Sequence, residues 1–167
     1  MLKSSDAKKS QILRKRQEKL YPFYRIADID FEAALSSLKI IKRYKRLDVR
    51  YALLRDIVVS YARPFVECKS LNGDKHRLEI KKFVPKVSRV LHDELIRLRH
   101  ELFAHTSLIY RNPRFVDWSR NGRKWFPMSF RAYDYQNLNR RLEDIFKLIS
   151  SARRNLQKEI GLIEEDL

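Results

Sequence analysis

Apolar residues recur at intervals of three and four positions in separate stretches of this 167-residue chain, and this spacing constrains the fold more than any other feature. Such a period places apolar side chains along one face of an α-helix. The principal stretches run over residues 31–46, 48–62, 86–107 and 133–160. Since 44% of the residues are hydrophobic, the chain carries enough apolar surface for one folded domain. The pattern therefore predicts an all-α fold.

Each stretch has its own stripe and its own boundary signals. Asp30 is a candidate N-cap for the first helix, and Asp48 opens the second. Pro64 predicts that the second helix ends near Ala62, because a residue before a proline avoids helical geometry. Residues 77–83 suit a short helix, and Pro85 suits the first turn of the third long helix. The stripes consist of Ala34, Leu38, Ile41 and Lys45; Tyr51, Leu54, Val58, Tyr61 and Phe65; Val87, Leu91, Leu95, Leu98 and Leu102; and Leu138, Leu142, Ile145, Ile149, Ala152, Leu156 and Ile160.

Two short segments indicate turns instead of helices. Residues 70–75 have the composition of a turn. Asn121-Gly122 lies between segments rich in aromatic residues and predicts a β-hairpin over residues 115–126. The aromatic and cationic residues of this hairpin either cap the helical core, which we favour, or stack on nucleic-acid bases. Together the signals predict an up-and-down bundle of four to five helices with a small β-hairpin insertion.

The amino-terminal residues differ from the rest in composition. Residues 1–20 are dominated by Lys, Arg, Gln and Ser and form a basic arm or helix, either solvated or bound to nucleic acid. Pro22 predicts a break, so the helical domain is expected to span residues 21–167. The chain has neither a signal-peptide pattern nor a membrane-length apolar run, and Cys68 is its single cysteine. These features predict a soluble cytoplasmic protein.

The net charge indicates the class of binding partner, and the glycine content excludes one class of phosphate-binding loop. Lys and Arg number 37 against 21 Asp and Glu, which gives a formal net charge of +16. Such an excess on one small domain favours a polyanion, most simply RNA or another nucleic acid. With 3 glycines, the chain cannot build a glycine-rich phosphate loop of the P-loop or dinucleotide-binding type.

The last turns of the third helix are rich in polar residues and include Arg99 and His105. A histidine suits proton transfer because its pKa lies near neutrality, and an arginine suits a phosphate because its charge is permanent and its donors are paired. On a straight helix, six positions separate these side chains by roughly 9 Å and about 120° of rotation, so one helix does not focus both on one phosphate. A two-fold dimer with these helices side by side would bring two of each into one cleft.

Neighbouring polar residues have more than one interpretation. Glu101 either orients His105 through a hydrogen bond or forms a surface ion pair with Arg97. The helix dipole also favours cations near this end, so the motif residues alone suit a structural role as well. We expect His92 to be structural and His76 to be exposed. Proton transfer by a histidine and phosphate binding by an arginine need no metal ion, and the sequence predicts no cofactor.

The segment RLRHELFAHTS, residues 97–107, resembles the signature of the HEPN superfamily (higher eukaryotes and prokaryotes nucleotide-binding domains). It is most similar to the abortive-infection-like bacterial branch. The resemblance implies a helical bundle, usually a homodimer with a composite active site. It also implies a metal-independent endoribonuclease that leaves 2′,3′-cyclic phosphates, often in antiphage defence or toxin–antitoxin systems. On this chain it assigns phosphate stabilisation to Arg99, acid–base catalysis to His105 and the polar position of the motif to His100.

Three functions are consistent with these features. The leading hypothesis is a homodimeric HEPN-type endoribonuclease acting on RNA, with an antitoxin or other protein as a further partner. The second is a non-catalytic nucleic-acid-binding or scaffold protein of the same fold. The third is a protein-binding module in which the positive charge is incidental. RNA cleavage distinguishes the first from the others, and salt-dependent RNA binding distinguishes the second from the third.

Overall fold

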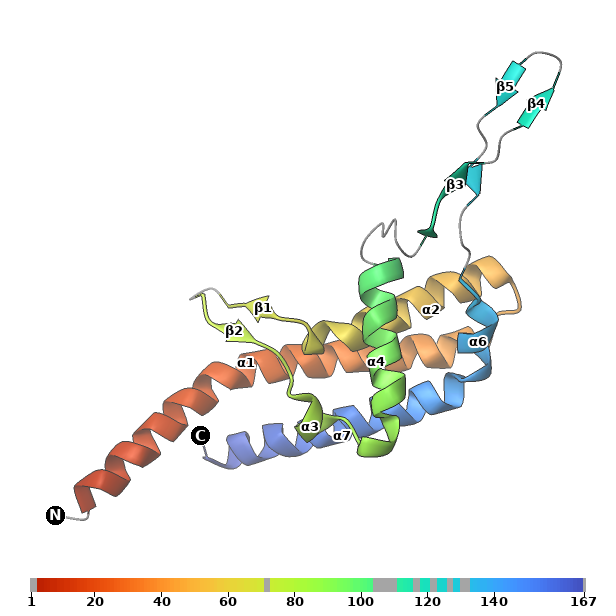
Figure 1. Ribbon diagram of the computed structural model, residues 1–167. Helices are drawn as coiled ribbons and strands as arrows, with labels where there is room; N and C mark the ends of the chain where they lie inside the picture. The colour runs from red at the N-terminus through yellow and green to blue at the C-terminus, as the bar shows by residue number, and fades with distance from the viewer. Residues whose placement is uncertain are drawn as a thin grey trace.

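The computed structural model describes residues 3–70, 73–103, 111–115, 118–120, 123–125, 128–129 and 133–166. These residues form an all-α bundle with small antiparallel strand pairs, which confirms the predicted fold class. In Figure 1, α1, α2 and α7 lie alongside one another and α4 crosses them. The helices are α1 (Lys3–Ile41), α2 (Leu47–Ala62), α3 (Ile80–Phe83), α4 (Arg89–Leu98), α6 (Tyr135–Arg140) and α7 (Leu142–Asp166), with 3₁₀ turns η1 (Arg63–Phe65) and η2 (Lys86–Ser88) and the π-helical turn η3 (Arg99–Phe103).

The core lies where the apolar stripes of α1, α2, α4 and α7 meet. Nearly all the predicted stripe residues are buried, and this burial is the main favourable contribution to folding. Tyr51 and Leu142 are half-buried, and Val87 is 93% exposed. It lies in the 3₁₀ turn η2, where three residues make a turn, so its side chain leaves the stripe of α4. Lys45 is also exposed, since α1 ends at Ile41.

The predicted break at Pro22 is wrong, because Pro22 lies inside α1. Pro22 cannot donate a hydrogen bond to the carbonyl of Glu18, which weakens the helix locally. Tertiary contacts on both sides offset this cost: Tyr24 is buried edge-on against Phe83, and Tyr21 Oη donates to Glu164 at 2.7 Å. As a consequence α1 crosses the expected boundary at residue 20, and its first turns extend past the bundle in Figure 1.

Asp30 is likewise not an N-cap, because it lies in the middle of α1. Its carboxylate accepts a hydrogen bond from Arg63 Nη1 at 3.2 Å instead. Burial raises the pKa of Asp30, and the contact with Arg63 opposes that effect. The pair therefore joins α1 to the end of α2.

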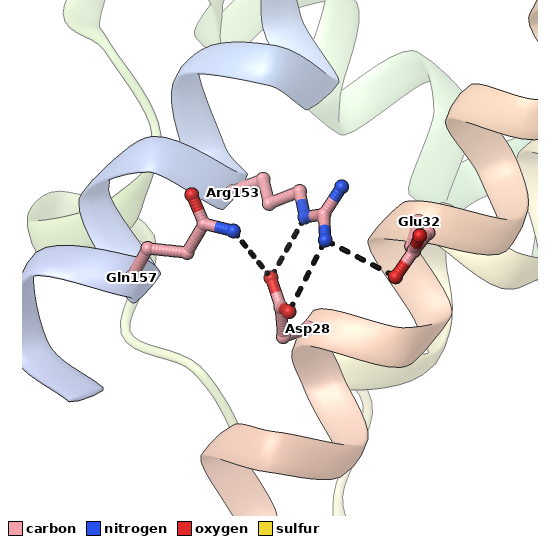
Figure 2. A network of polar contacts seen from close by, with 4 residues as sticks. All are labelled: Asp28, Glu32, Arg153 and Gln157. Carbon is pink, nitrogen blue, oxygen red and sulfur yellow. Dashed lines mark hydrogen bonds and ion pairs between the residues drawn. The ribbon is translucent and has the colours of Figure 1, made fainter. Parts of the chain in front are cut away.

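A second ion pair joins α1 to α7 (Figure 2). Arg153 donates from Nε to Asp28 Oδ1 at 2.8 Å and from Nη2 to Asp28 Oδ2 at 3.2 Å. Nη2 also reaches Glu32 at 3.2 Å, and Gln157 donates to Asp28 at 3.3 Å. The hydrogen bond to Asp28 raises the pKa of Arg153. Because the bidentate geometry fixes both partners, this network sets the register between the two helices.

The predicted helix over residues 133–160 is divided in two at Arg141. Asp134 caps α6 by accepting a hydrogen bond from the backbone N–H of Gln136 at 2.9 Å. Arg141 then has φ −109° and ψ 17°, which are not helical, and its side chain donates to Glu94 of α4 at 2.6 Å. Residues 133–160 formed the longest predicted stretch, but the longest described helix is α1, with 39 residues against 25 for α7.

The strand pairs are short. The predicted turn at residues 70–75 also connects a strand pair that the sequence did not predict, and Gly73 takes the positive φ of 82° that this turn requires. The predicted hairpin is confirmed, with one further strand pair at its base, and it extends away from the bundle in Figure 1. Asn121 and Gly122 lie outside the described residues. The strands are β1 (Cys68–Lys69) with β2 (Lys75–His76), β3 (Arg114–Phe115) with β6 (Met128–Ser129), and β4 (Trp118–Arg120) with β5 (Arg123–Trp125).

Within the described ranges, no helix is both long enough and apolar enough to span a bilayer.

Candidate functional site

The motif helix changes its geometry at Arg99. The α-helical stretch ends at Leu98, and residues Arg99–Phe103 form the π-helical turn η3. π-helical turns inside helices are frequent at functional sites. The rotation expected between Arg99 and His105 on a straight helix therefore does not apply from this point. Ala104 and His105 lie outside the described residues.

Arg99 borders a depression of about 300 Å³ between α2 and η3. We call it the arginine depression. Arg99 and Phe103 form one side of it, and the solvent-facing side of α2 forms the other. Its lining residues are Ala52, Arg55, Asp56, Val59, Arg63, Arg99 and Phe103. Three arginines and one aspartate thus line the same depression.

The charges in the arginine depression are unevenly compensated. Arg63 is paired with Asp30, and Asp56 accepts hydrogen bonds from the hydroxyls of Ser37 at 2.6 Å and Ser60 at 3.5 Å. Among the described residues, Arg55 donates to a neutral group, the backbone carbonyl of Phe103, at 3.3 Å, and to no carboxylate.

Arg99 is the third arginine of the depression. It donates from Nη1 to His100, and its Nε is buried without a hydrogen-bond partner among the described residues. A buried donor without an acceptor costs free energy.

The contact between Arg99 and His100 defines the state of the histidine. Arg99 Nη1 lies 3.0 Å from Nδ1 of His100. Because a guanidinium has donors only, Nδ1 must accept, and its lone pair must be free of a proton. His100 is then neutral with its proton on Nε2. The polar residue after the motif arginine therefore orients that arginine.

Glu101 is half-buried in η3. The sequence allowed either an ion pair with Arg97 or a hydrogen bond to His105. Across the described part of the chain, no ion pair joins Glu101 to Arg97, so that interpretation is wrong. The alternative, a hydrogen bond to His105, involves a residue outside the described ranges and stays a prediction.

The sequence did not indicate Arg55, Asp56 and Arg63 as members of this site. Ala52, Arg55, Val59 and Arg63 recur at intervals of three and four, which places them on one side of α2 and its continuation into η1, and Asp56 lies next to Arg55. The sequence prediction for this helix covered only its apolar stripe. The same period, applied to the arginines, would have placed them together.

His92 is structural, as expected. It is fully buried, and its Nδ1 lies 2.8 Å from Tyr61 Oη. Burial raises the pKa of Tyr61, so the phenol stays protonated and shares a hydrogen bond with Nδ1 of His92. The ring also packs edge-on against Phe65 at 4.6 Å between centroids. His76 was expected to be exposed but is half-buried, because it stacks on Phe23 with ring centroids 5.5 Å apart.

Protonation of His92 should destabilise the protein at acidic pH. Burial lowers the pKa of His92, and the charge of Asp93 opposes this only in part. The unfolded chain, with an ordinary histidine pKa of about 6.5, then binds a proton that the folded chain rejects. As pH falls below that value, the free energy of unfolding should decrease by up to about 1.4 kcal/mol per pH unit, until the pH passes below the folded-state pKa.

Urea unfolding between pH 7.5 and 5 measures this effect. His92→Gln should remove this part of the pH dependence, and His76→Gln should retain it. Equal pH dependence in the wild type and in His92→Gln would contradict the assignment.

No group of three or more His, Cys, Asp or Glu side chains within the described ranges lies close enough together to hold a metal ion. Cys68 is exposed on β1, away from the arginine depression.

Comparison of the chain with protein-family models, with curated proteins and with solved structures gave no match.

Proposed function

We propose that this protein is a HEPN-type endoribonuclease that cleaves RNA without a metal ion. The observation that carries the proposal is the setting of Arg99. The motif arginine lies at a π-helical turn and borders a depression lined by two further arginines. Its Nε is buried and has no acceptor among the described residues. A phosphate group in the depression would compensate the positive charges of Arg55 and Arg99, which have no carboxylate partner among the described residues.

The chemistry follows from the residue types. Neutral His105 takes the proton of the RNA 2′-hydroxyl as the 2′-oxygen bonds to phosphorus. Arg99 stabilises the extra negative charge on the non-bridging oxygens. The bond from phosphorus to the 5′-oxygen then breaks, and the imidazolium returns the proton to that oxygen. The products are a 2′,3′-cyclic phosphate and a 5′-hydroxyl. His100 holds the guanidinium in place through Nδ1.

A homodimer belongs to the same proposal. The outer side of α4 carries Val90, Asp93 and Arg97, all exposed, and Val90 is 81% exposed. Neither Asp93 nor Arg97 has an ion-pair partner within the described part of the chain. In an antiparallel two-fold pairing of α4, Asp93 of each subunit would face Arg97 of the other, which makes the surface self-complementary. Roles in antiphage defence or with an antitoxin follow from the resemblance alone and stay predictions.

Incubation with single-stranded RNA in excess EDTA tests this function. The wild-type protein should cleave the RNA and leave cyclic phosphate ends. His105→Ala should lower the rate by about 100-fold or more, since general acid–base catalysis contributes that much. His76→Ala, a matched change outside the arginine depression, should cleave like the wild type. Activity that survives His105→Ala, or that EDTA removes, would contradict the proposal.

The second candidate is a non-catalytic RNA-binding protein of the same fold. The arginine depression and the net charge of +16 support binding whether or not cleavage follows. In that case the RNA stays intact, and its affinity falls steeply as salt rises.

A further inference from the structure

The solvent-facing side of α2 has an arginine at each end of the arginine depression. Arg55 and Arg63 are eight positions apart, which corresponds to roughly 12 Å along a helix. Val59 lies between them and contributes apolar surface. The cations are therefore spread along α2 in a row.

Arg55 and Arg99 form the first position in this row. They come from different elements, α2 and η3, and both border the same depression. Neither has a carboxylate partner among the described residues, so the two positive charges repel each other when the depression is empty. Phe103 is buried beside them, and the apolar surroundings strengthen any bond to an anion. This end is suited to one phosphate group held by two guanidinium groups.

Arg63 forms the second position. It contacts Asp30 through Nη1 at 3.2 Å, yet its side chain remains 57% exposed whereas that of Asp30 is 16% exposed. A guanidinium has five N–H donors, so one carboxylate contact leaves others for a second anion. The contact with Asp30 also fixes the direction of the Arg63 side chain.

We propose that this side of α2 is the path of the RNA strand: Arg55 and Arg99 hold one phosphate, and Arg63 holds a neighbouring phosphate of the same strand. The inference rests on the proposed function for the identity of the polyanion as RNA. It adds to that function the residues outside the motif that bind the strand and the direction in which the strand leaves the motif.

The arrangement favours a nucleic-acid strand over an acidic protein. A strand offers phosphates at regular intervals, and the planar fork of arginine matches two phosphate oxygens at each. The apolar surface between the arginines suits a base or sugar. The carboxylate of Asp56 accepts hydrogen bonds from the Ser37 and Ser60 hydroxyls and forms no ion pair with Arg55 among the described residues.

Binding of a fluorescein-labelled single-stranded RNA to His105→Ala protein, in which cleavage is blocked, tests the path. Arg55→Gln should weaken binding by about ten-fold, as expected for loss of a charge-assisted contact. The double variant Asp30→Asn/Arg63→Gln should do the same without leaving a buried carboxylate unpaired. Each should reduce the slope of log affinity against log salt by about 0.7.

Arg154→Gln is the matched control, because Arg154 is exposed on α7 and has no ion pair among the described residues. It should bind RNA as tightly as the parent. Circular dichroism and thermal melting establish that each variant is folded. Where Arg55→Gln is unstable, Arg55→Lys, which keeps the charge but loses the paired donors, should still bind several-fold more weakly.

The possible outcomes distinguish failure of the proposed RNA path from failure of the proposed nuclease function. If Arg55→Gln and the double variant bind RNA like the Arg154→Gln control, the path is wrong, even where the wild type cleaves RNA. If polyglutamate of equal charge binds as tightly as RNA and depends on Arg55 in the same way, the site is one for acidic proteins and the path is also wrong. If both variants weaken RNA binding but the wild type cleaves nothing, the proposed nuclease fails and the binding path stands.

Discussion

Arg99→Ala should abolish most of the RNA cleavage, with a loss of about 100- to 1,000-fold in turnover at saturating RNA. This range is typical when a donor that stabilises the transition state is removed. The extra negative charge develops on the phosphate only as the 2′-oxygen attacks, so a guanidinium aimed at that phosphate contributes more to turnover than to binding. The measurement is single-turnover cleavage of a defined RNA in EDTA, with binding measured separately.

Variants at the same position sharpen this prediction. Arg99→Lys keeps a positive charge but lacks the paired donors and cannot reproduce the contact with His100. It should recover only part of the activity. Arg154→Ala is the matched control and should have wild-type rates. The Arg99 assignment is contradicted if Arg99→Ala cleaves within a few-fold of the wild type, or if it loses binding and turnover in equal measure because it no longer folds.

Leu95→Ala should have the largest effect on stability, a loss of about 2–5 kcal/mol in the free energy of unfolding. Leu95 is 0% exposed and belongs to the α4 stripe that holds the motif helix against the core. Truncation removes buried methyl groups and leaves a cavity that packed neighbours refill only in part. Urea denaturation at pH 7.5 measures the loss, and this pH avoids the titration of His92.

Val90→Ala is the control on the same helix. Val90 is 81% exposed, so its truncation should change the free energy of unfolding by less than about 0.5 kcal/mol. Leu95→Met, which conserves volume, should cost less than about 1.5 kcal/mol. A loss in Leu95→Ala no larger than that in Val90→Ala would mean that α4 does not pack as the structure describes.

These two predictions also distinguish unfolding from a loss of chemistry. Leu95→Ala should lose activity at the temperature where it unfolds and retain it below, because it leaves Arg99 in place. Arg99→Ala should be inactive at every temperature with an unchanged melting curve. If both variants lose activity only at the temperature where they unfold, Arg99 has a structural role.

The structure differs from the sequence predictions at residues where long-range contacts decide the backbone conformation. Pro22 predicted a helix end, yet the contacts of Tyr21 with Glu164 and of Tyr24 with Phe83 hold α1 together across it. The periodicity of residues 133–160 gave no indication of the break at Arg141, where the side chain turns to Glu94 of another helix. In each case the deciding partner lies far away in the sequence, where local patterns carry no information.

The sequence by itself determined the all-α class, most of the core and the motif, because apolar period and residue chemistry are local properties. His92 was also identified as structural from the sequence. Only the tertiary structure decided what surrounds Arg99. It turns the end of α4 into the π-helical turn η3 and brings Arg55 of α2 and Arg63 of η1 to the same depression as Arg99. The physical reason is that packing of the apolar sides of α2 and α4 against one core fixes which polar sides become neighbours, and neither helix encodes that pairing alone.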